Sequence, residues 1–145
     1  MSASSVVLLP NIPASVGVAR RTLGADLRAH GIAEPTVGDA ALVLSELLSN
    51  SIRHAQPLPG AQIRVTWRLN GGTVEVTVSD GGGLTRPHPV SSSPTSVGGR
   101  GLSIVEHLSR RWGVRDDEVG TTVWAELPTR GNANGSNGSG RLAAR

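Results

Sequence analysis

The chain of 145 residues contains no cysteine, no lysine, no phenylalanine and no tyrosine. Without cysteine, the protein has no disulfide, no thiol nucleophile and no cysteine-based metal site. Without lysine, it has no GxxxxGK[ST] phosphate loop, no strand lysine of the protein-kinase type and no Schiff-base chemistry. Any bound phosphate must therefore be held by backbone N–H groups, by arginine or by a metal ion.

All 14 basic residues are arginine, and the formal net charge is only +3. The arginines are scattered and the aromatic residues are three tryptophans, so the clustered basic patch typical of direct nucleic-acid binding is not expected. No apolar stretch approaches the length that spans a membrane, and no basic N-terminal segment precedes a long apolar one. We therefore expect a soluble, cytoplasmic protein that contacts neither membrane nor nucleic acid.

Hydrophobic periodicity predicts a single domain of mixed α and β structure. Apolar residues recur at helical spacing in three segments and alternate with polar residues in the predicted strands. The expected order is strand 6–10, helix 13–30, helix 39–55, a hairpin of strands 63–69 and 74–78, loop 84–98, helix 102–112, and strands 112–115 and 121–127. The tail from residue 131 is rich in Gly, Asn and Ser, a composition typical of disorder.

Two polar residues, Glu46 and Asn50, interrupt the apolar helical segment 39–55. At spacing i, i+4 they share one helix face, so a carboxylate and an amide lie side by side. An amide oxygen is a suitable single protein ligand for Mg²⁺ beside phosphate oxygens, and a nearby carboxylate can act as a general base. Arg53 lies one turn further along and can face phosphate. The alternative is that Glu46 and Asn50 are ordinary polar residues on the helix surface.

Asp80 follows an alternating strand and precedes three glycines. A carboxylate at a strand end can accept a hydrogen bond from the exocyclic amine of adenine, and glycine lets the backbone approach a flat base closely. The alternative is a simple turn, because Asp-Gly is a frequent turn dipeptide.

A second glycine cluster, Gly98-Gly99-Arg100-Gly101, opens the helix that follows the loop. Free N–H groups and the helix dipole favour an anion there, and Arg100 adds positive charge. A flexible hinge is the alternative interpretation. The order of these signals along the chain indicates one nucleotide pocket more strongly than any of them does alone.

From Val6 to Leu127 the chain resembles the GHKL (Bergerat-fold) ATPase superfamily, and within it the actinobacterial anti-sigma-factor serine/threonine kinases of the RsbW and SpoIIAB type. The resemblance implies an α+β fold: a two-layer α/β sandwich with a mixed, mostly antiparallel sheet and about three helices on one face. It also divides the chain into an ATP-binding domain, residues 1–130, and a disordered tail, residues 131–145.

The resemblance further implies roles for individual residues. Glu46 would be the catalytic base, Asn50 the Mg²⁺ ligand, and Arg53 a phosphate contact. Asp80 would bind the adenine amine, with Gly82 in the same motif. The remaining implied contacts are Gly99, Gly101 and Leu102 at the phosphates, and Thr121, which would support a water network at the base.

ATP and Mg²⁺ are thus the implied cofactors, and a sigma factor and a STAS-domain anti-anti-sigma protein the implied partners. Relatives of this type commonly form homodimers. One residue departs from the family pattern, because Leu84 replaces the last glycine of the D-x-G-x-G box, which favours weak nucleotide binding. Three functions therefore remain open: a protein kinase, a non-catalytic ATP-binding regulator, and an interaction module without nucleotide.

Overall fold

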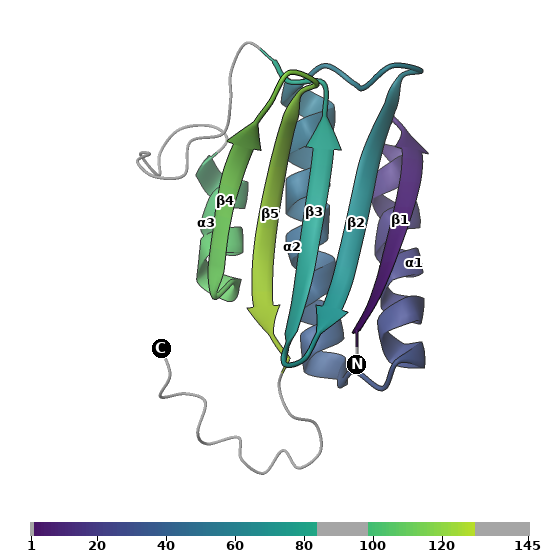
Figure 1. Cartoon of the computed structure of the whole chain (residues 1–145), viewed down its shortest axis with the longest axis vertical. Coiled ribbons are helices and arrows are strands. Elements are labelled where there is room, and N and C mark those ends of the chain that lie inside the picture. Colours follow the sequence, from purple (N-terminus) through teal and green to yellow (C-terminus); the bar gives the residue numbers. More distant parts are fainter. Residues whose placement is uncertain (1, 84–98, 130–145) are drawn as a thin grey trace.

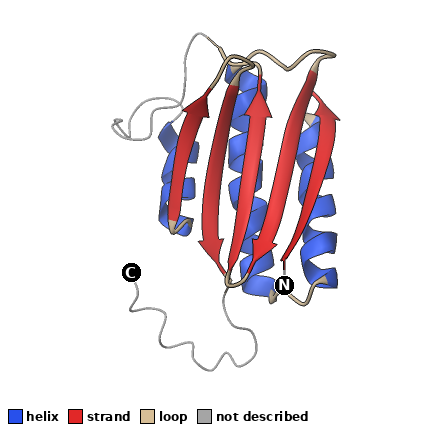
Figure 2. Cartoon of the chain, viewed as in Figure 1, coloured by secondary structure: helices blue, strands red, loops and turns tan. Residues whose placement is uncertain are grey.

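The computed structural model describes residues 2–83 and 99–129, and within them a five-stranded sheet is covered on one face by three helices (Figure 1, Figure 2). In chain order the elements are β1 (Ser2–Pro10), α1 (Ala14–Ala29), α2 (Glu34–His54), β2 (Gln62–Asn70), β3 (Thr73–Asp80), α3 (Gly99–Leu108), β4 (Arg111–Asp116) and β5 (Thr121–Pro128). The expected α+β sandwich is confirmed. The loop 84–98 and the tail 131–145 lie outside the described residues.

The sheet has the strand order β1-β2-β3-β5-β4, and every neighbouring pair is antiparallel. The described sheet therefore contains no parallel pair, where a mixed, mostly antiparallel sheet was expected. The predicted hairpin is β2 and β3, which pair through seven residue positions from Arg64↔Ser79 to Asn70↔Thr73.

One face of the sheet is apolar because alternate strand residues point to the same side. On β3 these are Val74, Val76 and Val78, which are fully buried against the helices. Helix α2 lies in the middle of the helical layer, between α1 and α3 (Figure 1). Its buried stripe includes Ala40, Val43, Leu44, Leu47 and Leu48, which explains why it reads as an almost wholly apolar helix.

The third helix ends earlier than the sequence predicts. Leu108 is its last residue, and Trp112 lies in β4 opposite Ala125 on the inner face of the sheet. The N–H of Arg110 already donates to the carbonyl of Glu126 at 2.7 Å, so pairing with β5 ends the helix. Trp112 follows Leu108 by four residues, a helical spacing, but it faces the core from a strand.

Helix α2 also begins at Glu34 rather than at residue 39, with Pro35 in its first turn, where the missing proline N–H costs no intrahelical bond. β1 extends from Ser2, four residues before the predicted start.

Four chain segments meet at one end of the sheet, drawn uppermost in Figure 1: the C-terminal end of α2, the end of β3, the start of α3 and the β4–β5 turn. We name this the Asp80 end. The opposite end carries the β2–β3 turn at residues 70–73, and we name it the Asn70 end. The predicted site residues fall at the Asp80 end because α2 and β3 both run toward it.

Candidate functional site

Asp80, the last residue of β3, is a buried carboxylate with only 4% of its surface exposed. Its Oδ2 accepts a hydrogen bond of 2.5 Å from Ser51 Oγ on α2. Its Oδ1 accepts one of 2.8 Å from the N–H of Gly82. Burial raises the pKa of Asp80, while the two hydrogen bonds oppose that rise by stabilising the ionised form and the Asp116 charge adds to it. Two oriented donors thus hold a desolvated carboxylate in place.

The glycines after Asp80 pack the chain against the segment that leaves α2. The N–H of Gly81 donates to the carbonyl of Gln56, and the N–H of Gln56 donates to the carbonyl of Gly82, both at 2.7 Å. A Cβ on Gly81 would collide with the carbonyl oxygen of Pro57. Gly82 has φ of +88°, a conformation that other residues rarely adopt. These two glycines therefore fix the end of β3 against the segment that follows α2.

Thr121, the first residue of β5, lies directly opposite Asp80 and is 6% exposed. Its Oγ1 donates to Asp116 Oδ1 at 2.8 Å, so the hydroxyl proton is directed toward β4. Gly120 precedes it, and a Cβ there would overlap the carbonyl oxygen of Asp80. The β4–β5 turn therefore closes tightly over the end of β3 and presents lone pairs of the Thr121 hydroxyl beside Asp80.

Glu46, Asn50 and Arg53 lie in the C-terminal half of α2, at the same end of the sheet. Glu46 and Asn50 are half-buried, and Arg53 is exposed in the last turn. Neither Glu46 nor Asn50 forms a side-chain hydrogen bond with another described residue. An amide oxygen with no partner among the described residues fits a Mg²⁺ ligand, since Mg²⁺ takes oxygen atoms and completes its shell with water and phosphate.

The start of α3 contains the glycine cluster that the sequence predicts to bind phosphate. Gly99, Arg100 and Gly101 form its first turn, whose N–H groups have no intrahelical acceptors. Leu102 is half-buried and packs against the core, which holds this turn beside α2. Gly99 is thus the first residue of α3, which begins three residues before the predicted start at residue 102.

The structure brings Asp80, Gly82 and Thr121 into one cluster, and it places the α2 residues and the α3 start at the same end. It adds Ser51, Gly120 and Asp116, which sequence reasoning did not select. Ser51 follows Asn50 directly, but α2 carries other serines in similar surroundings, and only tertiary packing distinguishes the one that reaches Asp80. Leu84, the departure from the family pattern, lies outside the described residues.

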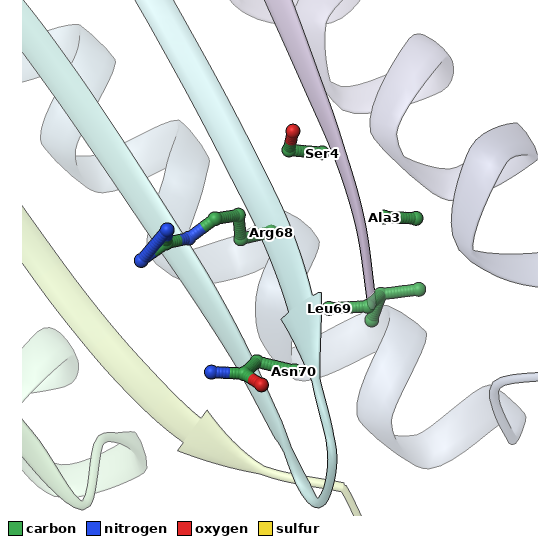
Figure 3. Close-up of a pocket in the computed structure, with 5 residues that line it drawn as sticks. All are labelled: Ala3, Ser4, Arg68, Leu69 and Asn70. Carbon is green, nitrogen blue, oxygen red and sulfur yellow. The ribbon is translucent and has the colours of Figure 1, made fainter. Parts of the chain in front are cut away.

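A shallow hollow of about 330 Å³ occurs elsewhere, at the Asn70 end (Figure 3). Its lining residues are Ala3, Ser4, Arg68, Leu69 and Asn70. The Arg68 side chain extends across to β3, where its Nη2 lies 3.3 Å from Glu75 Oε1. The length of β3 separates this hollow from Asp80, about 23 Å at the usual strand rise, so it is no part of the candidate site.

Two further properties bear on the kind of site. Within residues 2–83 and 99–129, no group of three or more His, Asp or Glu is placed to hold a metal ion. None of the described helices is long and apolar enough to cross a membrane.

Comparison with protein families matches residues 9–127 to the histidine kinase-like ATPase domain. The chain belongs to this family. The match covers all the described elements apart from most of β1 and the last residue of β5, so the family fold accounts for almost all of the described structure. The histidine kinase-like ATPase domain is an ATP-binding domain of the GHKL type, as the sequence motifs indicate. No curated protein sequence matches this chain closely enough to count as a relative.

Among solved structures, this histidine kinase-like ATPase domain is similar to the RsbU and RsbW domains of Rv1364c from Mycobacterium tuberculosis. The TM-score is 0.68 at 20% sequence identity, over 88% of this chain. The chain spans 32% of the length of that structure. At this identity the likeness establishes the fold, which is RsbW-like, and the expected GHKL architecture is thereby confirmed.

Proposed function

We propose that this chain binds Mg-ATP at the Asp80 end of the sheet and acts as an anti-sigma-factor protein kinase of the RsbW type. In this proposal the acceptor is a Ser or Thr hydroxyl of a STAS-domain antagonist. The observation that carries it is the buried Asp80 carboxylate, held by two donors in a domain of an ATP-binding family. A desolvated acceptor with free lone pairs suits the exocyclic amine of adenine.

The other groups have separate roles in the proposal. Asn50 offers the amide oxygen for Mg²⁺, which would neutralise phosphate charge. The first turn of α3 offers N–H groups to the phosphates. Arg53 and Arg100 add positive charge, and Leu102 anchors the turn. Glu46 would accept the proton from the attacking hydroxyl, which is the only proton transfer required of the protein.

Base recognition is tested by titrating Mg-ATP into the wild type and Asp80→Asn in a calorimeter. Asparagine keeps the shape but places an N–H₂ donor where an acceptor is needed, so we expect affinity to fall about tenfold or more. Glu75→Gln on the same strand removes the same charge at the Asn70 end and should bind as the wild type does. Equal binding by Asp80→Asn and wild type would refute base recognition by Asp80, and no binding by either would refute the ATP assignment.

Phosphoryl transfer is tested with γ-labelled ATP and purified STAS-domain proteins. Glu46→Gln should bind ATP normally but lose transfer by about a hundredfold or more, the usual size of a general-base effect. Glu34→Gln, in the first turn of the same helix, is the control. Transfer that survives in Glu46→Gln at the wild-type rate would remove Glu46 from the mechanism.

The second candidate is a non-catalytic regulator, in which bound ATP changes partner affinity without transferring phosphate. Leu84 in place of a family glycine favours it, because that glycine belongs to the nucleotide-binding motif. One result distinguishes the non-catalytic regulator from the kinase. Tight Mg-ATP binding, with no labelling of any STAS-domain protein that forms a complex with this chain, supports the regulator and contradicts the kinase.

A further inference from the structure

Two buried serines on α2 use their hydroxyl groups differently. Ser45 Oγ donates to the carbonyl of Ala41, four residues earlier, at 2.8 Å. This is the usual local bond of a serine inside a helix. Ser51 Oγ instead donates to Asp80 Oδ2, 29 residues away on β3, at 2.5 Å. The Ser51 hydroxyl therefore serves a tertiary contact rather than its own helix.

The contact fixes the orientation of the carboxylate. The terminal torsion of an aspartate side chain is broad, so a buried carboxylate with one donor can still rotate. Asp80 has donors on both oxygens, Ser51 on Oδ2 and the Gly82 N–H on Oδ1. Rotation would lengthen both bonds at once. Since Gly82 is itself held by its bond with Gln56, the carboxylate is anchored both to α2, through Ser51, and to the segment that follows α2.

Counting lone pairs shows what remains for a ligand. An ionised carboxylate has about four acceptor positions, and the two described donors occupy two of them. The neighbouring Thr121 hydroxyl gives its proton to Asp116, so it adds no third donor. The described protein therefore leaves acceptor capacity on Asp80 in a fixed direction.

We propose that Ser51 is a positioning residue for base recognition, which orients Asp80 to accept a hydrogen bond from the exocyclic amine of a purine nucleotide. The inference rests on the proposed ATP-binding function and adds a residue to it. Ser51 acts through Asp80 and need not touch the ligand. Its removal should therefore weaken recognition of the amine selectively, and leave the contribution of the rest of the nucleotide unchanged.

The test compares two ligands in two proteins. The ligands are Mg-ATP and Mg-purine riboside 5′-triphosphate, which is ATP without the exocyclic amine. The wild type should prefer ATP by about tenfold, the usual value of one hydrogen bond to a charged group. In Ser51→Ala we expect this preference to fall to about threefold or less, through loss of ATP affinity while analogue affinity is retained.

Ser45→Ala is the matched control, since it removes a hydroxyl of similar burial from the same helix without affecting Asp80. It should keep the wild-type preference for ATP. Ser51→Cys retains the shape of the side chain with a weaker donor, so its preference should lie between those of wild type and Ser51→Ala. It also supplies the measurement if Ser51→Ala fails to fold.

The outcomes distinguish this inference from the function on which it rests. If the wild type binds neither ligand, or binds both equally, base recognition by Asp80 fails and the role of Ser51 fails with it. If the wild type prefers ATP and the Ser51 variants keep that preference in full, base recognition stands and the role of Ser51 is refuted. A parallel loss of affinity for both ligands would also refute it, because that result indicates a merely structural contribution.

Discussion

At the Asn70 end of the sheet, β2 and β3 are joined by a turn in which Asn70, Gly71 and Gly72 are all exposed to solvent. At the Asp80 end, β3 leaves the sheet through Gly81 and Gly82, which are packed against the chain that follows α2. Both ends contain glycine pairs after a short polar residue. In one the glycines make a turn, and in the other they let two backbones touch beside a buried carboxylate.

The difference shows that similar local sequence can serve opposite purposes. At the Asn70 end Gly71 also has a positive φ, of +65°, but no atom lies within 4 Å of the position of its Cβ, so the constraint there is confined to the turn itself. The Asp80 end holds a desolvated acid, a positive-φ glycine and two close backbone contacts, each of which needs support from its neighbours. Such concentration of unfavourable features at one place is typical of a binding site rather than of a simple connection.

The largest expected effect compares alanine substitutions at two glycines in turns. In Gly120→Ala the new methyl group would overlap the Asp80 carbonyl oxygen, so we expect a loss of about 3 kcal/mol in the free energy of unfolding. In Gly72→Ala the nearest atom to the new methyl, Thr129 Oγ1, is 4.0 Å away, and the loss should stay below about 0.5 kcal/mol. Urea denaturation of both variants measures this. Equal losses in the free energy of unfolding would show that the Asp80 end is no more constrained than the Asn70 end.

The second prediction uses pH to compare Asp80→Asn with the wild type. Because burial raises the pKa of Asp80 in the folded state, the unfolded chain releases this proton at lower pH than the folded protein does. The free energy of unfolding of the wild type therefore falls, through the contribution of this residue, as pH rises from below the ordinary aspartate pKa of 3.8 through the raised pKa of the folded state.

Asparagine does not ionise, so its stability relative to the wild type should improve over that same pH range. Urea denaturation of both proteins at pH 3 to 7 would show it. Glu75→Gln, at the opposite end of β3, should show no comparable trend. A relative stability of Asp80→Asn that declines with rising pH would contradict the described environment of this carboxylate.

A smaller effect is expected at Asp117 in the β4–β5 turn. Its Oδ1 accepts hydrogen bonds from the N–H groups of Val119 and Gly120 at 2.8 and 3.0 Å. Asp117→Ala leaves those groups to exposed solvent, so we expect a loss of about 1 kcal/mol in thermal or urea denaturation. Thr73→Ser, which retains the hydroxyl bonded to the Asn70 carbonyl, provides a reference at the other end and should change little.

The smallest effect is expected for the ion pair of Arg68 and Glu75. Its partners are 53% and 30% exposed, and surface pairs of this kind contribute little. Glu75→Gln should lower the free energy of unfolding by no more than about 0.5 kcal/mol, and raised salt should reduce even that difference. A loss comparable to that in Gly120→Ala would mean that the Asn70 end is as tightly constrained as the other.

Elements with strong periodicity could be predicted from the sequence, and the contacts between them could not. The alternation of Val74, Val76 and Val78 with polar residues defines β3 and places Asp80 at its end. Trp112 was assigned both to the end of helix 102–112, because a residue four positions after Leu108 fits a helical face, and to the start of strand 112–115. Only the register with β5 places it in the strand. Local pattern contains no information about that register.

The candidate site could likewise be predicted only where local sequence marks a residue as unusual. Asp80, Glu46 and Asn50 could be selected because a polar residue at a strand end or inside an apolar helix is unusual. Ser51 could not, since a buried serine most often bonds its own helix, as Ser45 does. The glycines near Asp80 were recognised, but their close contacts with the backbone of residues 56–57 and 80 could not be predicted, because the positions of those residues depend on the whole fold.

The paired backbone bonds between Gln56 and the Gly81–Gly82 segment have one more consequence. They join the segment that follows α2 to the end of β3, so Asn50 on α2 and Asp80 on β3 are linked by these backbone bonds as well as by the bond between Ser51 and Asp80. A nucleotide bound by both residues, as in the proposed function, would have to match the distance between them. We therefore expect ATP analogues with a longer or shorter distance between the base and the metal-bound phosphate to bind more weakly, whatever their charge.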